Sequence, residues 1–258
     1  MTGGFLVEDT GTILFLMVMG FCASFVDSVV GGGGLISLPA ILFTGISPVV
    51  ALGTNKFASV MGALTSFAAF IRSGKVDISL IKILFPVSFV GSMIGVITVR
   101  QVPPDFLRPL VIVMLIAVTI YSVCKKDWGN ISTYHGMTKK MLYLSITAAF
   151  VMGFYDGFFG PGAGSFLLFS FLFVGFDFLG AAANARALNF ASNIGAMILF
   201  SYFGLVNYAY SIPMGIAMIA GAYCGTKMAL TKGVGYVKPL FVVMTTVLIG
   251  KQLWDFFK

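Results

Sequence analysis

Charged residues are scarce in this sequence: Asp, Glu, Lys and Arg make up 10% of its 258 residues, against about 25% in an ordinary soluble domain. Apolar residues make up 59%, and the mean hydropathy is +1.01. No soluble fold has enough interior to bury that much apolar surface. The composition therefore excludes disordered, nucleic-acid-binding and secreted disulfide-stabilised proteins, and it indicates an integral protein of the lipid bilayer.

Residues that hold metals, cofactors or nucleotides are scarce as well. The only histidine is His135, in the central loop, and the three cysteines share no spacing motif. No Walker motif is present. Gly162-Ala163-Gly164-Ser165 resembles part of an intramembrane serine protease site, but the apolar runs offer no histidine to activate that hydroxyl. We therefore expect no enzyme activity, no metal and no cofactor.

Apolar runs of about 20 residues are candidates for crossing a bilayer. Two runs, Leu35–Ile46 and Ser165–Phe176, have only 12 residues each, or about 18 Å as helix. Each follows a glycine cluster, which predicts a helix that breaks inside the membrane and turns back, although full spanning stays open. The longer candidates are residues 12–30, 49–71, 79–99, 106–124, 141–159, 184–204, 208–228 and 237–256.

The two halves of the chain resemble each other. ASFVDSVVGGGG at 23–34 matches MGFYDGFFGPGA at 152–163, which pairs Asp27 with Asp156. Three further matches follow in the same order, among them FAS at 57–59 with FAS at 190–192, at offsets between 129 and 133. The matches predict a duplication, with a first repeat at 1–124, a linker at 125–140 and a second repeat at 141–258.

Loop charges predict how the halves are oriented. The linker carries Lys125, Lys126, Lys139 and Lys140, so the positive-inside rule places it in the cytoplasm. On this topology eleven cations, Arg186 included, lie near the cytoplasmic side and five, Lys56 included, near the other. An odd number of spans per half inverts one half relative to the other. The predicted fold is an all-α polytopic membrane protein of two inverted repeats. Each repeat has a glycine-broken, re-entrant helix pair and three spanning helices, giving about 8–10 helical segments in all.

Two aspartates are candidates for proton coupling, because charged groups within a membrane span are rare and usually functional. Asp27 precedes the first glycine cluster by a few residues, and Asp156 holds the equivalent place in the second half. Either carboxylate could gain and lose a proton near neutral pH. Each could equally accept hydrogen bonds from the backbone N–H groups that a helix break leaves free.

Two cations are candidates for binding an anion. Lys56 begins the third segment, and Arg186 stands at the matching place in the second half, about three residues out of register by the FAS motifs. A guanidinium binds a carboxylate or sulfonate through a two-pronged contact. The alternative is that both side chains reach out to the membrane surface.

Polar groups near these charges complete the predicted binding site. The helix N-termini after the glycine clusters, Gly32–Leu35 and Gly162–Ser165, offer unpaired N–H groups to an anion. Side chains near them could orient a small ligand or instead form interhelical hydrogen bonds. The predicted substrate-binding residues are Arg186, Lys56, Asn55, Asn189, Asn193, Ser59, Ser192, Gly33, Gly34, Gly162, Gly164 and Ser165. The pairs Gly91/Gly95 and Gly221/Gly225 predict close helix packing and are compatible with a homodimer.

The motifs resemble those of a known family. GFYDGFFGPGxGSF at 153–166 closely resembles a signature of the TauE/SafE family, and the likeness extends to DxxxGGGG at 27–34, GTNK at 53–56 and LNFASN at 188–193. It covers nearly the whole chain and is nearest to the YfcA-like branch. The resemblance implies a bacterial inner-membrane permease that moves sulfite, organosulfonates or related small organic anions, usually outward.

The residues and the resemblance together predict a proton-coupled secondary transporter that works by alternating access. Its expected partners are a small anion, protons and the lipid bilayer, and no nucleic acid. Two other hypotheses stay open: a passive anion channel, and a membrane subunit that transports nothing. A channel would pass anions without saturation, and a structural subunit would tolerate the loss of both aspartates.

Overall fold

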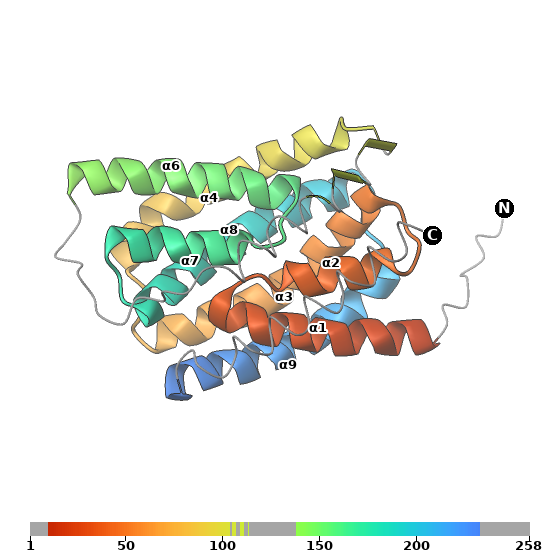
Figure 1. Cartoon of the computed structure of the whole chain (residues 1–258), viewed down its shortest axis with the longest axis horizontal. Helices are drawn as coiled ribbons and strands as arrows, with labels where there is room; N and C mark the ends of the chain where they lie inside the picture. Colours follow the sequence, from red (N-terminus) through yellow and green to blue (C-terminus); the bar gives the residue numbers. More distant parts are fainter. Residues whose placement is uncertain (1–9, 104, 107–108, 111–112, 114–137, 233–258) are drawn as a thin grey trace.

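The computed structural model describes residues 10–103, 105–106, 109–110, 113 and 138–232. Within these residues the chain forms α-helices and no β-strand (Figure 1). The predicted spans 106–124 and 237–256, and most of the 125–140 linker, lie outside the described residues. The helices are α1 (Thr10–Val30), α2 (Gly34–Leu42), α3 (Pro48–Arg72), α4 (Ile78–Arg100), α6 (Lys139–Phe158), α7 (Ala163–Val174), α8 (Phe178–Tyr202) and α9 (Tyr208–Lys232).

Side-chain caps set several of these helix starts. The carboxylate of Asp77 accepts a hydrogen bond from the N–H of Leu80 at 3.1 Å, and the hydroxyl of Thr138 accepts one from Met141 at 3.2 Å. Helix α8 begins six residues before the predicted 184, because Asp177 caps it at Gly180. The Asp177 side chain was the signal for that start in the sequence.

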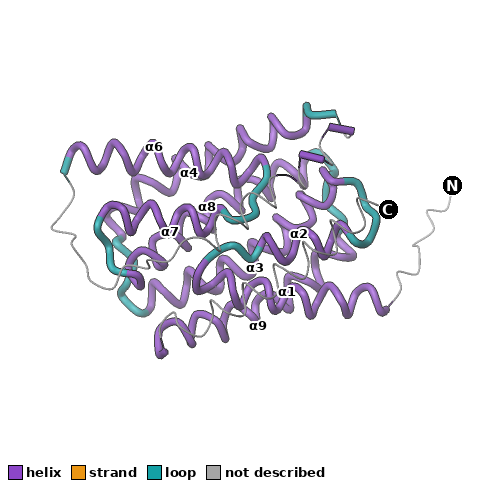
Figure 2. Tube along the Cα trace, viewed as in Figure 1, coloured by secondary structure: helices purple, strands orange, loops and turns teal. Residues whose placement is uncertain are grey.

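Two helices are too short to cross a bilayer. Helix α2 has 9 residues and α7 has 12, or about 14 and 18 Å. Each follows a loop that lies inside the bundle rather than at its ends, as Figure 2 shows. Gly31 and Gly162 in these loops have φ of 81° and 83°, backbone conformations that favour glycine. The predicted breaks at the two glycine clusters are therefore present.

Helix length and composition agree with a polytopic membrane protein. Among the described residues, Thr10–Ser28, Ile78–Arg100 and Lys139–Phe158 are long and apolar enough to cross a membrane. Helices α3, α8 and α9 are more polar but have 25 residues each, which is about 38 Å and longer than a bilayer core. The all-α polytopic fold predicted from the sequence is confirmed.

Helices of the two halves match in length and position. Helices α3 and α8 both have 25 residues and begin 130 positions apart, and α4 and α9 also begin 130 positions apart. At this offset Lys56 and Arg186 are equivalent, each being the ninth residue of its helix. The three-residue difference in register expected from the FAS motifs was therefore wrong, because those motifs are not the structurally equivalent segments.

Helix pairs from different halves pack through glycines. Helix α1 lies against α9, and α4 lies against α6. The predicted close-packing pairs lie at these two interfaces: a Cβ at Gly91 of α4 would stand 2.6 Å from the carbonyl oxygen of Phe150, and one at Gly225 of α9 would collide with that of Phe25. Both glycine pairs contact helices of the same chain, so they provide no face for a homodimer.

The long axis of the bundle has one cation-rich end. Helices α1 and α6 begin at opposite ends and both stop near the middle (Figure 1). Of the described cations at the ends, only Arg100 lies where α1 begins. The end where α6 begins holds Arg72, Lys75, Lys82, Lys139, Lys140, Lys227 and Lys232. Lys56 and Arg186, expected at opposite sides of the membrane, are instead both buried, with 3% and 0% exposure.

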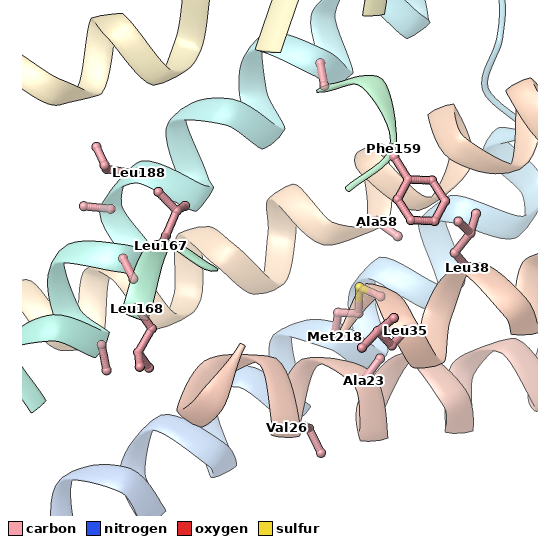
Figure 3. Close-up of a cluster of buried hydrophobic side chains, with 14 of the residues drawn as sticks. Ala23, Val26, Leu35, Leu38, Ala58, Phe159, Leu167, Leu168, Leu188 and Met218 are labelled. Carbon is pink, nitrogen blue, oxygen red and sulfur yellow. The ribbon is translucent and has the colours of Figure 1, made fainter. Parts of the chain in front are cut away.

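Buried apolar side chains form one cluster, part of which Figure 3 shows. The cluster includes Leu35 and Leu38 of α2 with Phe159, and Leu167 and Leu168 of α7 with Leu188 of α8. The apolar side chains of α2 and α7 are thus packed tightly against neighbouring helices. Their N-terminal ends are left to the polar residues described next.

Candidate functional site

The two glycine breaks touch each other inside the bundle. A Cβ at Gly164 would lie 3.2 Å from the Cα of Gly31, and a Cβ at Gly34 would lie 2.9 Å from the Cα of Pro161. Only glycines permit this approach of backbone to backbone. The N-termini of α2 and α7 therefore meet at one place, although they belong to different halves.

Two ion pairs join the halves at this place. The Lys56 Nζ lies 2.6 Å from Oδ1 of Asp156, and the Arg186 Nη1 lies 2.6 Å from Oδ2 of Asp27. Each pair combines the cation of one half with the aspartate of the other. Burial of these cations excludes the alternative that their side chains reach the membrane surface, and it makes each depend on its partner for charge compensation.

The Lys56–Asp156 pair is completed by side chains of α8. The Lys56 ammonium also donates to Oδ1 of Asn193 at 3.2 Å, and the hydroxyl of Ser192 donates to Oδ2 of Asp156 at 2.5 Å. Both charged side chains are almost fully buried, with exposures of 3% and 2%. Among the described residues, the further side-chain hydrogen bonds of this pair are to a neutral amide and a neutral hydroxyl group of α8.

The Arg186–Asp27 pair is completed by backbone. The N–H of Gly33, at the start of α2, donates to Oδ1 of Asp27 at 2.9 Å. Asp27 therefore takes the capping role that the sequence left open, in addition to its ion pair. Arg186 is fully buried, and its Nε and Nη2 have no hydrogen-bond partner among the described residues. Its guanidinium lies directly behind Gly164, where a Cβ would stand 2.6 Å from Nη2.

A small polar cavity of about 30 Å³ lies between the breaks. Most of the predicted site residues line it, and Arg186, Ser165 and Ser192 do not. Those that line it are Asp27, Gly33, Gly34, Asn55, Lys56, Ser59, Asp156, Gly162, Gly164, Asn189 and Asn193. Sequence analysis thus located the cavity, but Arg186 lies behind its wall rather than in it.

Several lining residues were missed by sequence analysis. Ser24 and Ser37 both line the cavity, and the hydroxyl of Ser37 donates to the carbonyl of Gly33 at 3.2 Å. Ser24 lies three residues before Asp27, and Ser37 lies three residues after Gly34. Helical spacing around the predicted residues could have identified both. Met218 of α9 also contributes, without any comparable signal in the sequence.

Two cations and two carboxylates converge at the cavity and balance each other. The Asn55 Oδ1, a hydrogen-bond acceptor, is buried without a partner among the described residues. No group of three or more His, Cys, Asp or Glu side chains comes together in the described part of the chain. The free donors of Arg186 and the helix N-termini add positive potential around the cavity.

Matching hydrogen bonds tie a loop of each half to a helix of the other. The backbone N–H of Asp77 donates to Oδ1 of Asn184 at 2.9 Å, and that of Asn207 donates to the hydroxyl of Thr54 at 2.9 Å. The residues of one contact lie 130 positions from their counterparts in the other. The two contacts stand at opposite ends of the bundle (Figure 1). We call them the Asp77–Asn184 and Thr54–Asn207 latches.

Comparison with known proteins identifies the family. The sequence pattern of the family described as "Sulfite exporter TauE/SafE" matches residues 16–251. The chain belongs to the TauE/SafE family. The resemblance predicted from the motifs around the two aspartates is confirmed.

Relatives of this TauE/SafE chain are named as transporters. It is 36% identical to the "Probable membrane transporter protein ORF9" of a Sinorhizobium species, over 94% of this chain and 93% of that protein. It is also 36% identical to the "Probable membrane transporter protein YfcA" of Escherichia coli K12, over 94% of this chain and 89% of that one. The "Probable membrane transporter protein YunE" of Bacillus subtilis is 28% identical. No solved structure matches the chain.

Proposed function

We propose that this TauE/SafE protein is a proton-coupled secondary transporter that exports sulfite, organosulfonates or related small organic anions. The observation that carries the proposal is the polar cavity between two helix breaks, where the buried Lys56 and Asp156 face each other. A buried cation beside a carboxylate provides both a binding group for an anion and a group that can carry a proton.

The binding roles follow from what lines the cavity. Lys56 contacts the anion directly, and Asn55, Asn189 and Asn193 orient it. Arg186 acts from behind Gly164 as a fixed positive charge, because it is fully buried and paired with Asp27. Lys56 thus makes the direct contact with the anion. By chemistry alone, the two-pronged guanidinium of Arg186 would be the better binding group, but Arg186 does not line the cavity.

Transport proceeds by alternating access between two inverted repeats. The cavity of about 30 Å³ holds only a few waters, since each needs roughly 10–15 Å³. A sulfonate therefore requires the surrounding helices to separate. Opening of the Asp77–Asn184 latch exposes the site to one side of the membrane, and opening of the Thr54–Asn207 latch exposes it to the other.

The orientation follows from the cation-rich end. By the positive-inside rule, the end that holds Arg72, Lys75 and Lys139 faces the cytoplasm of a bacterial inner membrane. The Asp77–Asn184 latch is then the cytoplasmic one. The 125–140 linker, most of which lies outside the described residues, also stays on this side.

Flux measured in proteoliposomes tests the function. We expect saturable flux of sulfite or an organosulfonate that a protonophore alters. The Lys56→Gln variant should raise the apparent substrate constant at least tenfold, which corresponds to about 1.4 kcal/mol of binding. Lys82→Gln, at an exposed position of α4, serves as the matched control and should transport like the wild type.

Two outcomes would contradict the proposal. Flux that never saturates and that no anion competes for would indicate a channel. Unchanged transport by Lys56→Gln would remove Lys56 from the site. Because Lys56→Gln leaves Asp156 without its cation, the double variant Lys56→Gln/Asp156→Asn provides a neutral pair that should fold, and it should be inactive.

A further inference from the structure

We propose that this site carries one monovalent anion and one proton together in the same direction, with the anion on Lys56 and the proton on Asp156. The inference rests on the proposed function and goes beyond it by fixing the stoichiometry, the direction of coupling and the charge of the substrate.

Charge balance in the buried site is the basis for the coupling. Lys56 and Arg186 contribute two positive charges, and Asp27 and Asp156 contribute two negative ones, so the empty site is neutral. An anion alone makes the site negative, and a proton alone makes it positive. Uncompensated charge is costly inside a membrane protein. The neutral forms are the empty site and the site that holds one anion and one proton, so these are the forms that reorient.

Contacts of the two aspartates assign the proton to Asp156. A protonated Asp27 would leave Arg186 without a charged partner, although its Nε and Nη2 already have no hydrogen-bond partner among the described residues. A protonated Asp156 leaves Lys56 without its ion pair, and the Lys56 side chain can then bind an anion in the cavity that it lines. The incoming anion takes the place of the carboxylate, and Asn193 continues to accept from the ammonium.

In the described part of the chain, the elements around Asp156 present no carboxylate besides Asp27 that could take its place. Helix α3 presents Lys56, α8 presents Arg186 together with Ser192 and Asn193, and α1 presents Asp27 across the cavity. Helix α7 contains no ionisable residue. On α6 itself the adjacent Tyr155 donates its hydroxyl to the carbonyl of Pro161 at 2.7 Å. The charged residues of α4, Lys82 and Arg100, lie near its two ends.

The same charge balance selects the substrate. A monovalent anion with one proton restores neutrality, whereas a divalent anion with one proton leaves the site negative. The site therefore takes bisulfite and singly charged sulfonates and rejects sulfate and other dianions. No covalent step is involved: the proton binds a carboxylate oxygen of Asp156 on one side of the membrane and leaves it on the other. Net direction follows the combined gradients of anion and proton, so export occurs when the outward gradient of the anion exceeds the inward gradient of the proton.

Isethionate is the probe that tests this coupling, because it is a strong acid and stays a monoanion, so any proton that moves comes through the protein. Proteoliposomes are given an inward isethionate gradient, with the membrane potential clamped by valinomycin and potassium and a pH dye in the lumen. We expect the lumen to become more acidic by one proton per isethionate taken up. We also expect sulfate to compete at least tenfold more weakly than bisulfite.

Each of the other outcomes would overturn one part of the proposal: the coupling, the charge selection or the transport itself. A lumen that becomes more alkaline would show exchange of anion against proton, and a lumen of constant pH with saturable isethionate uptake would show no coupling; both leave the transporter function standing. Equal competition by sulfate would remove the charge selection. Absence of saturable flux for every anion would overturn the proposed function itself and the inference with it.

Variants separate the roles of the two aspartates. Asp156→Asn should abolish acidification of the lumen while exchange of labelled isethionate across the membrane continues, because a permanently neutral side chain mimics the protonated form. Asp27→Asn should lower the yield of folded protein, because it removes the charged partner of Arg186. The double variant Asp27→Asn/Arg186→Gln replaces the whole pair and keeps the site neutral, so the fraction that folds should keep the wild-type ratio of protons to isethionate. Retained proton coupling in Asp156→Asn would overturn the assignment of the proton to Asp156.

Discussion

The two ion pairs have the same geometry and different surroundings. Both join a cation to an aspartate of the other half at 2.6 Å, and the cations occupy equivalent positions of α3 and α8. Lys56 and Asp156 both line the cavity, and their other side-chain contacts are hydroxyl and amide groups. Arg186 does not line the cavity, whereas Asp27 does, with 25% of its side chain exposed, and it is held additionally by the backbone N–H of Gly33.

The difference suggests that the two ion pairs, although equivalent in the two halves, have different roles. The Arg186–Asp27 pair includes a guanidinium, which keeps its charge at any physiological pH, and it fixes the start of α2. We propose that the Lys56–Asp156 pair separates when an anion takes the place of the Asp156 carboxylate beside Lys56. On this proposal the Arg186–Asp27 pair holds the two halves together, and the Lys56–Asp156 pair responds to the ligand.

The largest effect, a loss of stability, is expected when the Arg186–Asp27 pair is broken. Arg186→Gln leaves Asp27 without a cation, and removing one partner of a buried pair costs about 3–5 kcal/mol. Thermal unfolding of the purified protein in detergent measures this loss. Arg72→Gln, at an exposed position at the end of α3, is the control and should unfold like the wild type. An unfolding temperature of Arg186→Gln close to that of the wild type would show that the Arg186–Asp27 pair does not stabilise the fold.

A smaller change should sharpen the difference by acting on Asp156 alone. Ser192→Ala removes the hydroxyl that donates to Asp156, and a hydrogen bond to a charged group is worth about 1.5–3 kcal/mol. Because the lost hydrogen bond stabilises the empty site, in which Asp156 is paired with Lys56, the apparent substrate constant for isethionate should fall. Initial rates of isethionate flux at a series of concentrations and one fixed pH test this. Ser88→Ala, whose hydroxyl donates to the backbone carbonyl of Leu188 in α8, should leave the constant unchanged.

The smallest effects are expected at the latches, which extend the comparison to the two ends of the molecule. Thr54→Val and Asn184→Ala each remove the one neutral hydrogen bond of their latch, worth about 0.5–1.5 kcal/mol. Asn184→Ala also removes a hydrogen bond to the carbonyl of Gly180 within α8. Each should increase the time that one end stays open, by about twofold to tenfold. Ser59→Cys lines the cavity and, with the natural cysteines replaced by serine, reports opening through reaction with an impermeant thiol reagent.

The two latch variants serve as controls for each other. Thr54→Val should increase reaction from the side of the α8–α9 loop, and Asn184→Ala should increase it from the side of the α3–α4 loop. Equal increases from both sides in either variant would indicate general loosening rather than a latch.

Local patterns in the sequence predicted most of the helices and the position of the cavity. Glycine clusters marked the two breaks, and Asp27 and Asp156 stood out as charges in apolar segments. The start of α8 was placed too late because Asp177 was not recognised as a cap. Ser24 and Ser37 were missed because only residues within motifs were considered.

The pairing of the charges could not be predicted, because it joins residues far apart in the chain. Lys56 and Asp156 are 100 residues apart, and Asp27 and Arg186 are 159 apart. No local periodicity specifies which cation meets which aspartate. The same limitation placed Lys56 and Arg186 at opposite membrane surfaces, since a charge count along the sequence treats every cation as a loop residue. Burial opposite a carboxylate from the other half is a property of the assembled fold alone.

The most direct test of the central claim is a count of the protons bound with the anion at equilibrium. Calorimetric titration of the purified protein with isethionate, repeated in buffers of different ionisation enthalpy, gives this number without any membrane. Coupled binding at Lys56 and Asp156 predicts uptake of one proton for each isethionate bound, and none in the Lys56→Gln/Asp156→Asn variant. Binding of isethionate to the wild-type protein with no proton uptake, or with proton release, would contradict it.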